Sequence, residues 1–143
     1  MKQTSSLFTF SDRSLKLQAE VAAFVADRIL PAEAGFAAHA NDPATRWSIP
    51  PQLEALKAEA RALGLWNLFL PDPERGSGLS NLDYAPIAEL TGRSLHAPEV
   101  FNCSAPDTGN MEVLAHIASP EQQAPWLPRL LAGEIRSAFA MTE

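Results

Sequence analysis

The sequence predicts an all-α fold, and three kinds of observation support this. Alanine, the best helix former, occurs 24 times among 143 residues, whereas valine, isoleucine and threonine together occur 15 times. Apolar residues recur at helical spacing in several stretches. Serines and prolines precede those stretches at positions that begin helices. We therefore expect one orthogonally packed bundle of about five or six helices.

The first helix is expected to begin at Ser11 and Asp12, which supply a capping oxygen and a negative charge for the positive end of the helix. Its apolar residues share one face, namely Leu17, Val21, Phe24, Val25 and Ile29. Pro31 should kink or stop this helix, although residues 32–40 can continue as a helix beyond it. The sequence Asn-Asp-Pro at residues 41–43 predicts a turn.

A second helix is predicted to begin at the two prolines at residues 50–51, where a missing N–H costs nothing. It should end at Gly64, because glycine readily adopts the left-handed conformation that terminates helices. The segment 65–70 is too apolar for a solvated loop and should be buried. Residues 80–83, Ser-Asn-Leu-Asp, resemble a capping box, and the helix they open should run to about Arg93.

Prolines and a serine mark the remaining helix starts. Pro98 and Pro106 each stand where a helix can begin, and Ser119 precedes a proline as a capping residue. Gly133 is placed to terminate the last helix. From residue 135 the chain carries Ile, Phe and Met without a helix signal, and we interpret it as the start of a β-strand. A single strand cannot satisfy its own backbone hydrogen bonds, so we expect the sequence to belong to a longer protein.

Charge and composition argue against several classes of function. The net charge of −6 makes nucleic acid an improbable partner, because phosphate binding needs clustered Lys and Arg. The single Cys103 excludes an internal disulfide and a cysteine-based zinc site, and the three histidines are too widely separated to suggest a metal site. No apolar run approaches the roughly 18–20 residues that span a bilayer, and no secretory signal is recognisable. We expect a soluble cytoplasmic domain with no membrane, metal or nucleic-acid partner.

The last third of the chain carries a specific resemblance. Residues 126–134 read Trp-Leu-Pro-Arg-Leu-Leu-Ala-Gly-Glu, and residues 137–143 read Ser-Ala-Phe-Ala-Met-Thr-Glu. This arrangement closely resembles the acyl-CoA dehydrogenase family, in which a Leu-Pro-x-Leu-x-x-Gly-Glu helix end leads into a strand closing on Thr-Glu. Residues 102–112 resemble one subgroup in particular. That subgroup is typified by the tenth and eleventh human members, which are linked to hydroxylated acyl-CoA breakdown.

Further segments, residues 65–71, 76–80 and 119–123, are also similar to the family, although Ser77 stands where many members carry glycine. The resemblance implies an all-α N-terminal domain over residues 1–134. It also implies that residues 135–143 start a β-domain, which is followed in the family by a four-helix domain.

The resemblance further implies the activity of a flavoprotein oxidoreductase of fatty acid metabolism. The family binds FAD, oxidises the Cα–Cβ bond of acyl-CoA to give enoyl-CoA, passes electrons to an acceptor protein and forms homo-oligomers. Its glutamate base lies in the C-terminal domain, so we expect no catalytic residue in this chain and no activity from the chain alone. The alternative is a helical interaction module that resembles the domain and performs no chemistry.

Three residues near the end are implied to contact the cofactor. Thr142 matches the family threonine at the pyrimidine edge of the flavin ring, and Met141 supplies backbone beside it. Phe139 matches a position, often aromatic, whose strand backbone approaches the ring. The alternative interpretation is that Thr142 and Phe139 are ordinary strand residues. We also expect the side chains of Trp126, Phe139 and Met141 to be unusually exposed.

A second group is implied to line the acyl pocket, namely Asn102, Asp107 and Asn110. Polar groups there would suit a hydroxylated acyl chain, because an unpaired buried polar group costs about 1–3 kcal/mol. Asp107 and Asn110 also stand near a predicted helix start, where capping and the helix dipole offer an alternative explanation. The carboxylates of Glu89, Glu99 and Glu112 stand in no motif, and we interpret them as surface groups.

Overall fold

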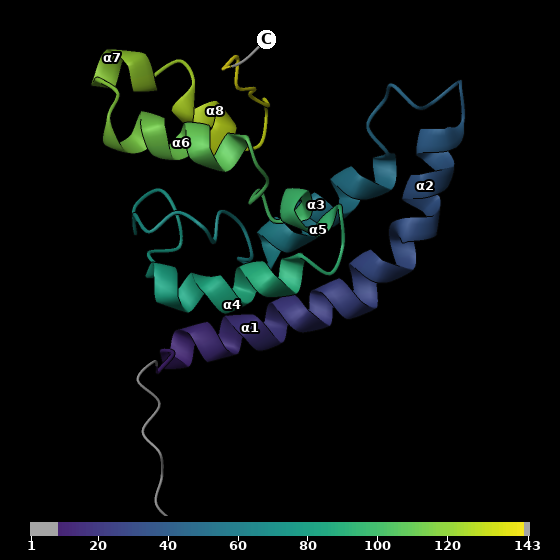
Figure 1. The fold of residues 1–143 in the computed structure, drawn as a ribbon, viewed down its shortest axis with the longest axis horizontal. Coiled ribbons are helices and arrows are strands. Elements are labelled where there is room, and N and C mark those ends of the chain that lie inside the picture. Colours follow the sequence, from purple (N-terminus) through teal and green to yellow (C-terminus); the bar gives the residue numbers. More distant parts are fainter. Residues whose placement is uncertain (1–8, 142–143) are drawn as a thin grey trace, which may run out of the picture.

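The computed structural model describes residues 9–141, in which eight α-helices and no strand are found (Figure 1). The helices are α1 (Asp12–Phe24), α2 (Glu33–Asn41), α3 (Pro51–Ala62), α4 (Asn81–Thr91), α5 (Ala97–Val100), α6 (Asp107–His116), α7 (Pro120–Gln123) and α8 (Leu127–Leu131). Only α1, α2, α3, α4 and α6 are nine residues or longer. The all-α prediction is confirmed.

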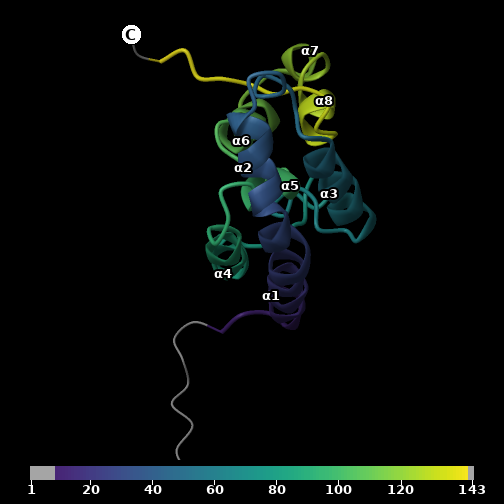
Figure 2. The ribbon, with the colours of Figure 1, turned by 90° about the vertical axis from the view of Figure 1, so that its right-hand side faces the viewer.

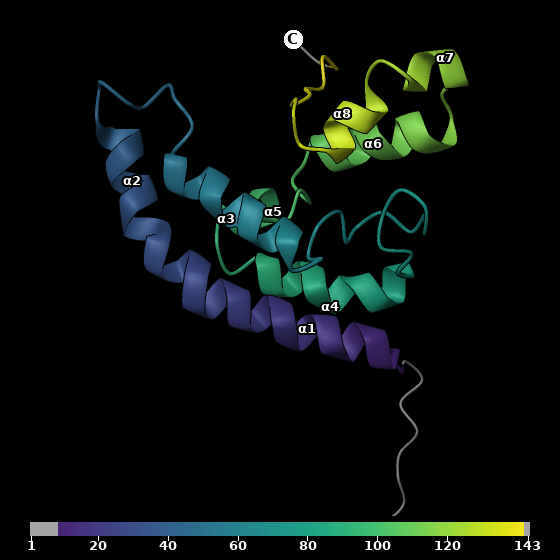
Figure 3. The ribbon, with the colours of Figure 1, turned by 180° about the vertical axis from the view of Figure 1, so that it is seen from behind.

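Helices α1 and α2 form one continuous bent arc (Figure 3). The bend contains a π-helical segment, Val25–Ile29, and a 3-10 turn, Leu30–Ala32. Pro31 explains it, because proline has no N–H and its ring displaces the carbonyl one turn earlier. The predicted kink is therefore confirmed. At the start of the arc the Ser11 hydroxyl accepts the Ser14 N–H at 3.1 Å, as the capping signal predicts.

Helix α4 lies alongside α1 and runs in the same direction (Figure 1). Asp83 joins their first turns, because its carboxylate accepts the Ser11 N–H at 2.9 Å and its carbonyl accepts the Ser14 hydroxyl at 2.7 Å. The Ser80 hydroxyl accepts the Asp83 N–H at 3.1 Å, so half of the predicted capping box is formed. The Asp83 carboxylate is used between helices, and the bond from Ser11 lowers its pKa.

Two cores lie between the helices. Helices α1 to α5 enclose the larger one, which includes the fully buried Phe36 and Phe101. The smaller core lies beneath α6 and α8 and consists of Phe69, Leu70, Met111, Leu127 and Leu130. Tyr84 and Cys103 pack against both cores. The buried segment 65–70 contributes to both, as its composition predicts, and thereby joins the layer of α6, α7 and α8 to the rest (Figure 2).

The C-terminal tail (residues 135–141) leaves α8 and has no regular structure (Figure 2). The strand expected from residue 135 is therefore not formed within the described part of the tail. A strand needs a partner to take up its N–H and C=O groups, and residues 9–141 fold into helices and loops that offer none. The start of the tail is instead held by side chains of α6, as described below.

Gly64 and Gly133 follow α3 and α8 with φ values of 74° and 68°, so both predicted terminators are confirmed. An added Cβ at Gly64 would meet nothing within 4 Å, whereas one at Gly133 would lie 2.8 Å from the Trp66 ring. That ring is held, because its Nε1 donates to the Leu131 carbonyl at 2.8 Å and the Arg61 guanidinium stacks on it.

The two glycines therefore form a matched pair for substitution. Gly64→Ala should destabilise the fold by about 1 kcal/mol, the cost of a left-handed conformation for an L-residue. Gly133→Ala should cost a further 1–2 kcal/mol or so, because the Trp66 ring must shift. Urea denaturation followed by circular dichroism measures both, and equal losses would show that the ring yields freely.

Candidate functional site

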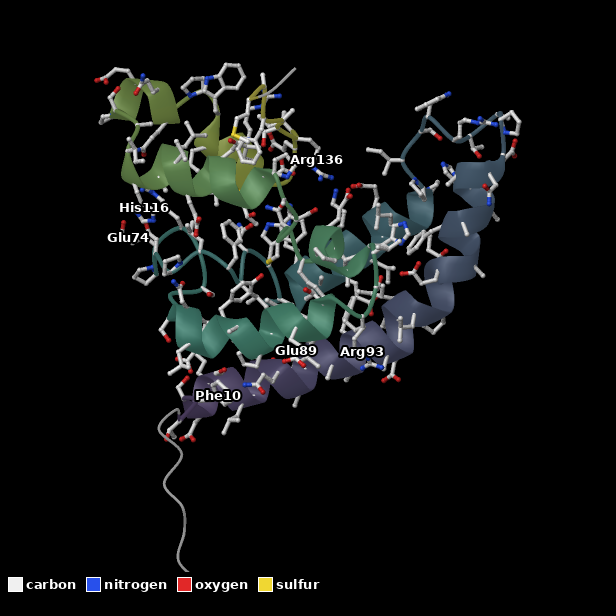
Figure 4. The ribbon with its side chains drawn as sticks, viewed as in Figure 1. Phe10, Glu74, Glu89, Arg93, His116 and Arg136 are labelled. Carbon is white, nitrogen blue, oxygen red and sulfur yellow. The ribbon has the colours of Figure 1, made fainter. Side chains whose placement is uncertain are left out.

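The candidate site is a groove between α6, α8 and the C-terminal tail. Its volume is about 470 Å³, and most of its lining is aliphatic or aromatic. The lining residues are Asn110, Val113, Leu114, Trp126, Leu130, Ile135, Arg136, Ser137 and Ala138. Figure 4 places Arg136 near the first turn of α6 and His116 near its other end. The groove therefore combines an apolar wall with a few polar groups, as small-molecule sites do.

Asp107, the first residue of α6, binds the tail. Its side chain is almost fully buried, and Oδ1 accepts both the N–H and the hydroxyl of Ser137 at 2.6 Å. Oδ2 accepts the Nε–H of Arg136. Burial acts to raise the pKa of Asp107, but the hydrogen bonds from Ser137 and Arg136 outweigh it and hold the pKa below its usual range. The carboxylate is therefore ionised at neutral pH.

Arg136 extends this contact into a chain of alternating charges. Its guanidinium also pairs with Glu99 of α5 at 2.6 Å, and Glu99 lies 3.9 Å from the ammonium of Lys57 on α3. Lys57 in turn donates to Glu54 at 2.8 Å. Burial acts to lower the pKa of Arg136, but its two carboxylate partners raise it overall. Glu99 is thus a partly exposed carboxylate that bridges two cations, Arg136 and Lys57.

Asn110 and Phe139 continue the attachment of the tail to α6. The Asn110 amide donates to the Ser137 hydroxyl at 2.8 Å, so Asp107 and Asn110 hold the same residue from successive turns. The Phe139 ring lies over Gly109, where an added Cβ would come within 3.2 Å of it. The tail therefore follows the surface of α6 at least as far as Phe139.

The exposure expected for the apolar residues near the end is confirmed. Trp126 is 53% exposed, Phe139 57% and Met141 82%. Thr142, implied to contact the cofactor, lies outside the described residues. The described part of the tail thus presents an aromatic ring and a thioether to its surroundings, next to the groove.

The structure separates Asn102 from the other two residues grouped with it. Asn102 is buried under α8, and its amide donates to the Asn67 side chain at 2.7 Å and to the Leu130 carbonyl at 3.0 Å. The Asn67 amide donates to the Leu131 carbonyl at 2.9 Å. These asparagines thus add to the donors at the end of α8, where the Leu130 carbonyl also accepts the Gly133 N–H and the Leu131 carbonyl the Trp66 Nε1–H. Asn102 is not among the residues that line the groove.

Sequence reasoning missed Arg136, Ser137 and Glu99. Their contacts join residues 29 to 37 positions apart, and no local pattern signals such pairs. Cys103 is partly buried, and burial raises the pKa of its thiol. Within residues 9–141, no cluster of three or more His, Cys, Asp or Glu side chains could hold a metal ion. No helix in that range is long and apolar enough to cross a membrane.

Comparison with known proteins places these features in a family. Residues 11–134 match the family model described as acyl-CoA dehydrogenase, N-terminal domain. The chain is 51% identical over 133 residues to acyl-CoA dehydrogenase family member 10 of Mus musculus, covering 90% of this chain and 12% of that protein. It is 46% identical over 143 residues to family member 11 of Homo sapiens, covering 98% of this chain and 18% of that protein.

A solved structure from Mycobacterium abscessus that carries the same family name has a similar fold. Its TM-score is 0.87 at 54% sequence identity, and the match covers 95% of this chain and 35% of that one. The chain thus spans a minor part of the length of the relatives it matches. The match over residues 11–134 and the shared helical fold together show that this chain belongs to the acyl-CoA dehydrogenase family, in the region of its N-terminal domain.

Proposed function

We propose that this chain is the N-terminal helical part of an FAD-dependent acyl-CoA dehydrogenase that oxidises the Cα–Cβ bond of acyl-CoA to enoyl-CoA. The observation that carries the proposal is the apolar groove on α6, bounded by a tail whose sequence resembles the strand that contacts the flavin in the family. In this proposal the domain boundary lies between residues 134 and 135. The glutamate base belongs to a domain beyond residue 143.

The groove suits an acyl chain. Leu114, Leu130 and Ile135 give it aliphatic walls, which favour burial of methylene groups. Asn110 is a polar group at the same surface and would suit a hydroxyl on the acyl chain, since unpaired buried polar groups are costly. This supports acyl-CoA as the substrate and a hydroxylated acyl-CoA as the finer assignment.

The tail suits one edge of a flavin. For residues 138–141, the structure records no backbone hydrogen bond to the rest of the described chain, so their N–H and C=O groups are open to a ligand. Phe139, Met141 and Thr142 would hold the ring from this side. FAD, when bound, supplies the acceptor for the hydride that leaves Cβ. The residues of this chain bind and orient, and the proton transfer belongs to the base.

Two further assignments extend the family resemblance: we propose an electron-transfer protein as the acceptor and a homo-oligomeric full-length enzyme. The cytoplasmic location remains a proposal from the sequence, which shows no recognisable secretory signal. The isolated chain should be inactive, because it supplies one wall of the site. A partly built site loses most of the preorganisation on which catalysis depends.

The test compares the 143-residue chain with the full-length protein. FAD is titrated into each while flavin fluorescence is followed, and each is assayed with acyl-CoA and a dye acceptor. We expect the chain alone to bind FAD weakly or not at all and to show no turnover. The full-length protein should bind FAD and oxidise acyl-CoA. The free fatty acid serves as a control substrate. Turnover by the chain alone, or a full-length protein without flavin or activity, would contradict the proposal.

A further inference from the structure

Asp107 is placed as a helix-capping residue but does not act as one. Helix α6 begins after Pro106, and no side chain caps its first turn. The Asp107 carboxylate accepts its three hydrogen bonds from Arg136 and Ser137, two adjacent residues of the tail. A buried carboxylate is costly unless it is paired. This site meets that cost with bonds to the tail, which indicates that holding the tail is its role.

The attachment fixes where the residues that follow lie on α6. Ser137 is bonded to Asp107 and Asn110, and Phe139, two residues later, lies on the same helix against Gly109. Loss of the bonds at Ser137 would therefore remove the first of these two contacts and loosen the backbone beyond it.

We propose that Asp107 is a positioning residue for the flavin-contacting tail. Through Ser137 and Arg136, Asp107 sets where the backbone of residues 139–141 meets the flavin. Arg136 is in turn held by Glu99, so the anchor is tied to α5 as well as α6. This inference rests on the proposed function and reassigns a residue that the family resemblance grouped with the acyl pocket.

The decisive variant is Asp107→Asn in the full-length holoenzyme. The amide keeps the shape of the carboxylate but cannot accept at both positions, so one tail donor faces an NH₂ group. We expect the FAD dissociation constant to rise and kcat to fall, each about tenfold, with a shift in flavin potential. The KM for acyl-CoA should change less than about twofold, because the groove walls are untouched.

Three further variants make the test specific. Ser137→Ala removes the hydroxyl that donates to Asp107. It should shift the flavin spectrum and potential in the same direction as Asp107→Asn does, to a smaller extent. Ser137→Thr keeps the hydroxyl and should behave as the native enzyme. Glu112→Gln removes an exposed carboxylate from the same helix and should change nothing. An unchanged flavin spectrum and potential in Asp107→Asn and Ser137→Ala, with a raised KM for acyl-CoA, would overturn the proposal and return Asp107 to the pocket.

A measurement without flavin separates this inference from the proposed function. In the 143-residue chain, Asp107→Asn should accelerate hydrogen exchange at the Ser137 amide, which donates to the carboxylate in the native chain. Unaccelerated exchange would show that Asp107 does not hold Ser137 and would overturn the inference. Accelerated exchange in a protein whose full-length form binds no FAD would contradict only the proposed function.

Discussion

Replacing Phe101 with alanine should lower the free energy of unfolding by about 3–5 kcal/mol. The side chain is fully buried, and its ring meets that of Phe24 edge to face with centroids 5.5 Å apart. Truncation would leave a cavity between α5 and α1, because neighbouring helices collapse only partly into such a space. The contact between the aromatic rings would be lost as well.

Urea denaturation followed by circular dichroism measures this loss. Leu95→Ala is the matched control, since Leu95 lies on the loop before α5 and is 94% exposed. We expect the control to change stability by no more than about 0.5 kcal/mol. A Phe101→Ala loss as small as that of the control would mean that the two aromatic rings do not couple α5 to α1.

The parts of the fold that the sequence predicts are those with local causes. The Ser11 and Ser80 caps, the kink at Pro31 and the glycine terminators each depend on interactions within about one helical turn. Such interactions are encoded in the identity and spacing of a few neighbouring residues. Pattern reading therefore locates helix ends well, and it anticipates the burial of residues 65–70 from their apolar composition.

The parts of the fold that the sequence does not predict depend on contacts between residues far apart in the chain. Asp83 has the spacing of a capping-box residue, yet its carboxylate bonds to Ser11, 72 positions away. Asp107 likewise stands at a helix start and bonds to Ser137. In each case a local role and a tertiary role compete for one carboxylate, and only the packing of the helices decides between them. The family resemblance drew attention to the tail and to residues 102–112, but it does not show that Asp107 and Asn110 bond to the tail.

Asn102 gives the last and most direct test of how the site region is built. Asn102 and Asn67 have φ values of 53° and 54°, in the left-handed region that asparagine tolerates better than most residues. Each bonds the other or a carbonyl of α8, so backbone conformation and side-chain chemistry select the same residue type at both positions.

Asn102→Ala should therefore destabilise the chain by about 3 kcal/mol, of which about 1 is left-handed strain and about 2 the loss of its hydrogen bonds to the Asn67 side chain and the Leu130 carbonyl. Asn102→Gly removes the donors without the strain and should cost about 2 kcal/mol. Combining Asn102→Gly with Asn67→Gly in a double-mutant cycle should give a coupling energy of about 1 kcal/mol, since the two side chains share a bond of 2.7 Å.

The same variants distinguish a structural from a substrate-binding asparagine. If Asn102 caps α8, its replacement lowers the stability of the 143-residue chain. In the full-length enzyme, activity then falls to the same extent with all acyl-CoA substrates. If Asn102 instead contacts the acyl chain, stability is retained and the preference between hydroxylated and plain acyl-CoA changes. The buried amide, with its bonds to Asn67 and the Leu130 carbonyl, leads us to expect the first result.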